Sequence, residues 1–291
     1  MTSASKRIIK TLSLFLPGIF LVGSNIGTGS VTTMAAAGAN YGMSLLWTIL
    51  ISCLATAFMI SIYGKYTLVT GETALQAFRK HIHPGVGIFF IVALTAAVSG
   101  SVMGVMGIIS DISYEWSKRL VDGGIDAIYF AIIYITVVYF IFWGGKTQIF
   151  QRALAVTVSF MGICFIINFF IMMPPPIDIL KGLLPCIPEI PADADKNPFL
   201  VIAGMVGTTV FSGMFIIRTT LVKEAGWTII DFKHQRKDAM ISASLMFLIS
   251  AAIMAAAAGT IYADPNSPGL DNAVQMITLL EPLAGSLAVA I

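Results

Sequence analysis

Charged side chains are scarce in this sequence. Only 11% of its 291 residues are Asp, Glu, Lys or Arg, whereas 57% are hydrophobic. A typical soluble domain has about 25% charged residues, and the mean hydropathy here is +0.89. These values exclude an ordinary soluble domain. They indicate an integral membrane protein that has the lipid bilayer as a partner.

Residue types that carry catalysis and metal binding are also few. The three cysteines, Cys53, Cys164 and Cys186, and the three histidines have spacings that match neither a disulfide framework nor a metal cluster. The sequence contains no nucleophile–base pair and no phosphate-binding loop, so we expect no enzyme and no cofactor. The net charge of +2 comes without a basic stripe, so we expect no nucleic-acid partner.

Long apolar runs dominate the rest of the chain. A membrane-spanning helix needs about 20 mostly apolar residues. The sequence predicts spans at residues 12–39, 43–64, 86–110, 126–144, 152–173, 198–222 and 239–262, and an eighth that begins near Ala273. We therefore predict an all-α transmembrane fold, with residues 1–291 in a single transmembrane domain.

Positive residues gather on one side of these spans. With a cytoplasmic N-terminus, 13 of the 17 lysines and arginines fall in cytoplasmic segments, and the outside holds Lys118, Arg119, Lys181 and Lys196. Cytoplasmic loops carry such an excess. The sequence thus predicts a multi-pass protein with its N-terminus in the cytoplasm. The lack of an organelle-targeting signal favours the plasma or inner membrane.

The stretch at residues 22–47 is apolar but contains an unusual break. Gly23, Gly27 and Gly29 lie in it among several hydroxyl side chains. A helix in lipid must satisfy its own backbone polar groups, so a break is tolerated only where it is buried in protein or lines a wet cavity. Interrupted helices of this kind form the substrate sites of secondary transporters. Glycines also let neighbouring helices pack closely, and this stretch alone leaves both interpretations open.

The span at 198–222 repeats this pattern. Its interrupting glycines and mid-depth hydroxyls are Gly204, Gly207, Gly213, Thr208, Thr209 and Ser212. The first predicted span and the sixth are the broken ones, so one repeat consists of five spans. Because five is an odd number, the second repeat enters the membrane from the opposite side, and the two repeats have inverted topology. The first repeat covers about 12–173, and an incomplete second repeat covers about 198–291. Paired interrupted helices in corresponding positions indicate a transport site.

The two breaks predict a pocket without strong metal ligands. N–H groups and positive dipole ends of the second half-helices, near Ser30 and Gly213, point to its middle. Hydroxyls add neutral donors and acceptors from Thr28, Ser30, Thr208, Thr209 and Ser212. No carboxylate, imidazole or thiolate stands there, and Arg218 lies near a span end where snorkelling explains it. Since Mg²⁺ and Mn²⁺ usually take carboxylate ligands, these residues favour a neutral, anionic or still-hydrated solute.

Three segments of the chain carry a resemblance to a known family: GANYGMSLLW at residues 38–47, Thr70–Gly71 with the helix that follows, and GTTVFSGMFIIRTTLV at residues 207–222. They resemble segments of the Nramp (natural-resistance-associated macrophage protein) family of divalent-metal transporters. The resemblance covers essentially the whole chain. It implies a LeuT-like fold of two inverted five-span repeats, with broken first and sixth helices that line the site. It also implies a divalent metal ion of the Mn/Fe/Mg class as substrate.

The metal-site motifs depart from this family. Its Asp-Pro-Gly-Asn falls on Gly27-Thr28-Gly29-Ser30, and its Met-Pro-His falls on Phe211-Ser212-Gly213. The family's ligand positions are thus Gly27, Ser30 and Phe211, and residues 93–109 hold no counterpart of its proton-coupling acid. The residues that we expect to bind substrate are Gly27, Thr28, Gly29, Ser30, Gly207, Thr208, Thr209, Phe211, Ser212 and Gly213.

Three functions remain open at this point. A divalent cation can bind partly hydrated through carbonyls and hydroxyls, or the altered pocket takes an anion or a neutral solute. The third interpretation is a non-transporting membrane receptor that kept the fold. The LeuT-like core needs ten spans and this chain stops inside the eighth, so we expect either a fragment of a longer protein or a truncated, inactive form. The unpaired apolar end at residues 283–291 favours a fragment.

Overall fold

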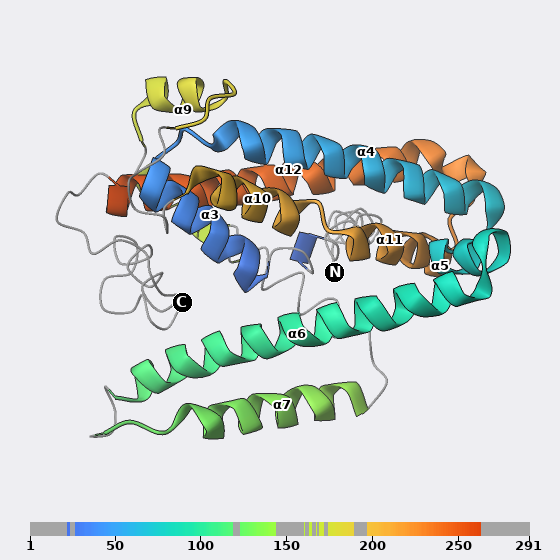
Figure 1. The fold of residues 1–291 in the computed structure, drawn as a ribbon, viewed down its shortest axis with the longest axis horizontal. Coiled ribbons are helices and arrows are strands. Elements are labelled where there is room, and N and C mark those ends of the chain that lie inside the picture. The colour runs from blue at the N-terminus through green and yellow to red at the C-terminus, as the bar shows by residue number, and fades with distance from the viewer. Residues whose placement is uncertain are drawn as a thin grey trace, which may run out of the picture.

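The computed structural model describes residues 22–23, 27–118, 123–143, 160, 163–164, 167, 169–171, 174–188 and 197–262. Every regular element in these ranges is helical (Figure 1). In chain order they are α3 (Thr28–Tyr41), α4 (Leu46–Thr70), α5 (Ala74–Ala77), η1 (Phe78–Ile82), α6 (Pro84–Ser117), α7 (Ala127–Trp143), α9 (Pro176–Gly182), α10 (Pro198–Thr209), α11 (Ser212–Glu224), η3 (Ile229–Asp231), α12 (Phe232–Ala257) and η4 (Ala258–Tyr262).

Among the described residues, four helical stretches are long and apolar enough to cross a membrane. They are α4, α6, α10 together with α11, and η3 together with α12 and η4. These stretches confirm the predicted spans at 43–64, 86–110, 198–222 and 239–262, and α7 matches the span at 126–144. The span at 152–173 lies largely outside the described residues, and the eighth span lies entirely outside them.

α4 continues beyond its predicted end and stops at a glycine. Gly71 has a left-handed φ of +69°, and its N–H donates to the Thr67 carbonyl at 2.8 Å. Glycine adopts this helix-ending conformation without a Cβ penalty. The turn also holds Glu72, whose carboxylate accepts a hydrogen bond from Lys80 Nζ at 2.6 Å. This bond from Lys80 lowers the pKa of Glu72.

The core is formed by α3, α4, α10, α11 and α12, which lie side by side (Figure 1). Its fully buried side chains include Met34, Ile49 and Met205. At the contact between α3 and α12, a Cβ on Gly38 would overlap the Met254 carbonyl oxygen. Small residues at such a contact let two helix backbones approach closely, which is a main source of helix association in membranes.

α6 and α7 form a pair at one edge of this core (Figure 1). Ser113 and Tyr134 join the two helices by a hydrogen bond of 2.7 Å between their hydroxyl oxygens. Large apolar side chains on both helices are exposed, among them Phe89, Met103 and Phe140. A helix that is apolar on its exposed side suits contact with lipid, so this pair fits the outer surface of a membrane protein.

Arg218 does not snorkel to the membrane surface, and that prediction was wrong. Its side chain is 0% exposed. Nη1 donates to Asp238 Oδ2 on α12 at 2.5 Å, and Nη2 donates to the Gln235 carbonyl at 3.4 Å. Gln235 Nε2 in turn donates to the Ile60 carbonyl of α4 at 3.1 Å. The prediction failed because the predicted span begins only at residue 239 and leaves Asp238 outside it, whereas α12 already begins at Phe232 and buries one polar face.

Candidate functional site

The first predicted break lies at the start of α3. Val22 and Gly23 are helical, and α3 begins at Thr28 after an extended Gly27 with φ −96° and ψ −178°. Residues 24–26 lie outside the described residues. The N-cap residue Gly27 has no side chain that could cap this helix start, and the Val31 N–H donates to the Gly27 carbonyl at 3.1 Å. The first N–H groups of a helix lie at its polar, positive end, so the start of α3 presents such an end to the break.

The second break separates α10 from α11. Thr209 ends α10 and Ser212 begins α11, while Val210 (φ −98°, ψ 65°) and Phe211 (φ −90°, ψ 120°) leave the helical conformation. Phe211 occupies the N-cap position of α11 without a capping side chain. The structure thus confirms a broken helix in the span at 198–222. At both breaks the N-cap residue, Gly27 or Phe211, makes no side-chain cap.

The positions of the glycines within the breaks differ from the prediction. Gly204 and Gly207 lie inside α10, and Gly23 and Gly29 are also helical, so these glycines do not interrupt their helices. A glycine inside a helix lowers the stability of the helix by about 1 kcal/mol relative to alanine. Close packing against a neighbouring helix can offset this loss. A Cβ on Gly204 would lie only 3.2 Å from the Thr33 methyl group of α3.

The two breaks lie beside each other. A Cβ placed on Gly29 would be 4.0 Å from the Thr208 methyl group, and α3 packs against α10. We call residues 27–30 and 207–213 together the junction. It contains all the residues predicted to bind substrate, from the start of α3, the last turn of α10 and the start of α11.

Two of the predicted hydroxyls at the junction donate within their own helix. Thr208 Oγ1 donates to the Gly204 carbonyl at 2.9 Å, and Thr209 Oγ1 donates to the Met205 carbonyl at 2.8 Å. A hydroxyl that donates its proton still has lone pairs that can accept. These threonines therefore offer oxygen lone pairs, whereas backbone N–H groups of the two helix starts are donors at the junction. Ser30 is buried and Ser212 is exposed.

The Phe211 ring folds over Gly213 at the start of α11. A Cβ on Gly213 would overlap this ring and would lie 3.3 Å from Leu94 Cδ2 of α6. Gly213 is buried as a result. The junction therefore has an apolar wall made by Phe211 and Leu94. The sequence offered no signal for Leu94, which is one of many leucines in apolar spans.

α4 contributes a polar contact that the sequence analysis missed. Thr56 Oγ1 donates to the Thr209 carbonyl at the end of α10, at 3.0 Å in a buried environment. Thr48, Ser52 and Thr56 are all buried and recur every four residues on α4. This spacing places them on one face of the helix. A polar stripe in an otherwise apolar span is the signal that could have identified Thr56.

Replacing Thr56 by valine is expected to destabilise the protein by about 1–3 kcal/mol, the usual cost of leaving a buried hydrogen-bonding group without its partner. The variant keeps the side-chain shape but removes the donor to the Thr209 carbonyl. Unfolding of the purified protein in mixed detergent micelles measures the change in free energy.

Thr48→Val is the matched control for this variant. Thr48 lies on the same face of α4, is also buried, and its hydroxyl has no hydrogen-bond partner among the described residues. Its replacement is expected to leave the unfolding free energy unchanged or to raise it. Equal destabilisation by the two variants would show that the hydrogen bond from Thr56 to the Thr209 carbonyl does not contribute to the unfolding free energy.

Carboxylates, imidazoles and thiols do not gather at the junction. The described part of the chain contains no group of three or more His, Cys, Asp or Glu side chains that could hold a metal ion. The arrangement can therefore contact a solute through backbone N–H groups, backbone carbonyls, hydroxyl oxygens and the Phe211 ring.

Comparison with known proteins bears directly on this pair of broken helices. A family model described as "Natural resistance-associated macrophage protein-like", or Nramp, matches residues 18–291. The chain belongs to the Nramp family. This match confirms the resemblance seen in the sequence over nearly the whole chain.

Curated Nramp relatives are distant from this chain in sequence. One is the natural resistance-associated macrophage protein 2 homolog of Dictyostelium discoideum, 24% identical over 76% of this chain and 34% of the relative. Another is the divalent metal cation transporter MntH of Chromohalobacter salexigens, 23% identical over 86% of this chain and 58% of the relative. This Nramp chain thus spans between about one third and three fifths of the length of these relatives.

Solved structures confirm the fold. The chain is similar to the Eremococcus coleocola manganese transporter, with a TM-score of 0.72 and 16% identity, over 94% of this chain and 63% of the other. The similarity establishes the predicted LeuT-like transmembrane fold for this Nramp chain, with the sixth helix broken between α10 and α11.

Proposed function

We propose that this protein is a secondary transporter that carries a divalent metal ion through the junction. The observation that carries the proposal is the contact between two interrupted helices, where Gly29 and Thr208 lie side by side. Transporters bind their substrates where discontinuous helices expose backbone groups near the middle of the membrane. Family membership and similarity to relatives such as the divalent metal cation transporter MntH support a divalent cation as the solute.

The ion is proposed to keep part of its water. The ligands proposed at this site are backbone carbonyls and the hydroxyl oxygens of residues such as Ser30, Thr208 and Thr209. Mg²⁺ dehydrates reluctantly and usually retains several waters, and carbonyl and water ligands suit Mg²⁺, Ca²⁺ and Mn²⁺ rather than soft metals. We therefore expect transport of Mn²⁺ and Mg²⁺ with little selectivity between them and no preference for Cd²⁺.

Uptake of Mn²⁺ into liposomes that contain the purified full-length protein tests this function. Gly29→Leu is expected to reduce uptake to the level of protein-free liposomes, because its side chain extends into the junction toward Thr208. Gly104→Leu is the control, since no atom lies within 4 Å of a Cβ at that position on α6. External Mg²⁺ is expected to compete with Mn²⁺ at similar concentrations.

Two results would contradict metal transport through the junction. One is Mn²⁺ uptake that Gly29→Leu and Gly104→Leu affect equally, which would separate transport from the junction. The other is a folded protein that moves no Mn²⁺ or Mg²⁺. Absence of uptake for every solute tested would favour a receptor that kept the fold.

An anion or neutral solute is the second candidate. The observation that favours it is the pair of helix starts at the junction, whose N-cap residues Gly27 and Phe211 make no side-chain cap. The N-terminus of a helix carries partial positive charge and N–H donors, which attract anions. Uptake of phosphate, sulfate or small neutral solutes in the same liposomes, with inhibition by Gly29→Leu, would establish this alternative in place of metal transport.

We also propose the orientation and the repeat structure predicted from the sequence. The ends of α4 and α11 and the start of α12 lie at one end of the molecule (Figure 1), together with Lys65, Lys223 and Arg236. An excess of basic residues marks the cytoplasmic side, so we place this end and the N-terminus in the cytoplasm of a plasma or inner membrane. Residues 1–291 then form one domain, with inverted repeats at about 12–173 and 198–291.

A further inference from the structure

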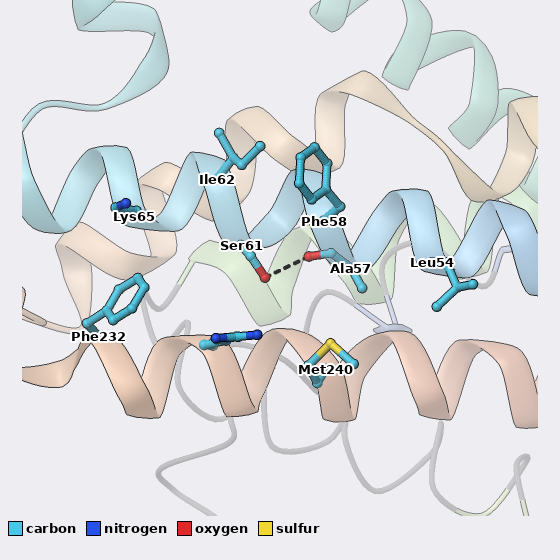
Figure 2. Close-up of a pocket in the computed structure, with 9 residues that line it drawn as sticks. Leu54, Ala57, Phe58, Ser61, Ile62, Lys65, Phe232 and Met240 are labelled. Carbon is cyan, nitrogen blue, oxygen red and sulfur yellow. Dashed lines mark hydrogen bonds between the residues drawn. The ribbon is translucent and has the colours of Figure 1, made fainter.

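A groove runs between the outer faces of α4 and α12, away from the junction. It has a volume of about 350 Å³, and α4 lines it with Leu54, Phe58 and Ile62. Figure 2 shows these side chains along α4, with Met240 on α12 opposite Ala57. Phe58 is 65% exposed and Met240 is 48% exposed. Among the described residues the groove therefore opens outward, and its apolar side chains suit contact with the hydrocarbon of a bilayer.

The groove has the length of one half of a bilayer. Leu54, Phe58, Ile62 and Lys65 follow one another at helical spacing on a single face of α4. From Leu54 to Lys65 the helix rises about 16 Å. The hydrocarbon core of one leaflet is about 15 Å thick, so the groove matches an acyl chain that lies parallel to α4.

The two cationic lining residues lie away from Leu54: Lys65 stands at the other end of the groove, and Arg236 lies one turn further in, between Phe232 and Met240 on α12. Both side chains are exposed. Lys65 Nζ lies 5.7 Å from the centre of the Phe232 ring, and Figure 2 shows the two side chains together at the end of the groove opposite Leu54. Neither cation forms a salt bridge within the described part of the chain.

We infer that this groove binds an anionic phospholipid. One acyl chain lies along Leu54, Phe58 and Met240, and the phosphate contacts Lys65 and Arg236. An apolar groove alone accepts the chain of any lipid, whereas basic residues at the level of the headgroups select a negatively charged one. In the proposed orientation the lipid belongs to the cytoplasmic leaflet, which is the leaflet rich in anionic lipids. The inference depends on the membrane location of the chain and not on the transported solute.

Native mass spectrometry of the purified protein measures this binding. The protein is incubated in detergent with an equimolar mixture of phosphatidylglycerol and phosphatidylcholine, and the retained lipid is counted. The parent is expected to retain phosphatidylglycerol preferentially. Each basic residue near an anionic headgroup is worth about fivefold in affinity, so Lys65→Gln/Arg236→Gln is expected to weaken retention about 25-fold. Retention of phosphatidylcholine is expected to stay unchanged.

Lys233→Gln/Lys237→Gln is the matched control. It removes the same charge from exposed positions of α12 that do not line the groove, and it is expected to retain phosphatidylglycerol as the parent does. If this control lost as much phosphatidylglycerol as the groove variant, the lipid would be attracted by the basic residues of this end of the molecule in general. That result would contradict a specific site in the groove. Equal retention of the two lipids by the parent would overturn it as well, and so would retention of neither.

Two further variants keep the test decisive if the glutamine variant does not fold. Lys65→Arg/Arg236→Lys preserves both charges and is expected to keep the preference for phosphatidylglycerol. Met240→Trp narrows the groove with both charges in place and is expected to lower retention of phosphatidylglycerol. Unchanged retention in Met240→Trp would show that the lipid does not occupy the groove. Liposome uptake of Mn²⁺ plays no part in these outcomes, so failure of this site and failure of metal transport are distinguishable.

Discussion

Replacing Arg218 by methionine is expected to lower the unfolding free energy by about 3–5 kcal/mol, the usual cost of breaking a buried ion pair by removing one partner. Arg218 and Asp238 are 0% and 1% exposed, and their contact joins α11 to α12. The variant leaves the Asp238 carboxylate in an apolar interior without its cation. Unfolding of the purified protein in mixed micelles, or its thermal midpoint, measures the loss.

Two controls separate burial from the ion pair itself. Lys80→Gln removes an ion pair of similar length, the 2.6 Å contact with Glu72, but Lys80 is 64% exposed, so stability is expected to change little. The double variant Arg218→Met/Asp238→Leu replaces both charges with apolar groups and is expected to recover most of the stability lost in Arg218→Met. A small effect of Arg218→Met, equal to that of Lys80→Gln, would contradict the buried pair.

The buried pair also illustrates what the sequence could and could not predict. Spans such as 43–64 and 198–222 followed from composition, because about 20 apolar residues in a row have few alternatives to a membrane helix. That the span at 198–222 is broken followed from Gly and Thr residues at mid-depth, although the exact position of the break did not. The partner of Arg218 did not follow, because Asp238 lies 20 residues away and only the packing of α11 on α12 brings the two together.

The sites of the breaks show a further limit. Glycines marked the correct span, but the chain leaves the helix at Val210 and Phe211, whereas Gly204 and Gly207 stay helical. Local propensity cannot tell a glycine that ends a helix from one that lets a neighbour approach. The residue packed against the glycine makes the difference. At Gly204 this residue is Thr33, whose methyl group lies close to the glycine. The spacing of Gln235, Asp238 and Ser242 on α12, and of Thr48, Ser52 and Thr56 on α4, would have indicated two buried polar faces.

Changing Gly38 to alanine is expected to destabilise the protein by about 1–3 kcal/mol, the usual cost of adding volume to a well-packed core. The new Cβ would overlap the Met254 carbonyl oxygen and come within 2.9 Å of the Ala257 Cβ. Both neighbours belong to α12, and a backbone carbonyl cannot rotate away as a flexible side chain can. α3 must therefore move away from α12, and the start of α3 at the junction must move with it.

Gly104→Ala provides the opposite result from the same chemical change. No atom lies within 4 Å of a Cβ at Gly104, and the residue is inside α6. Replacing a glycine within a helix by alanine stabilises by roughly 0.5–1 kcal/mol because the unfolded chain has less freedom to lose. The two variants are thus expected to shift the unfolding free energy in opposite directions. A shift in the same direction would contradict the close approach of α3 and α12, on which the geometry of the junction depends.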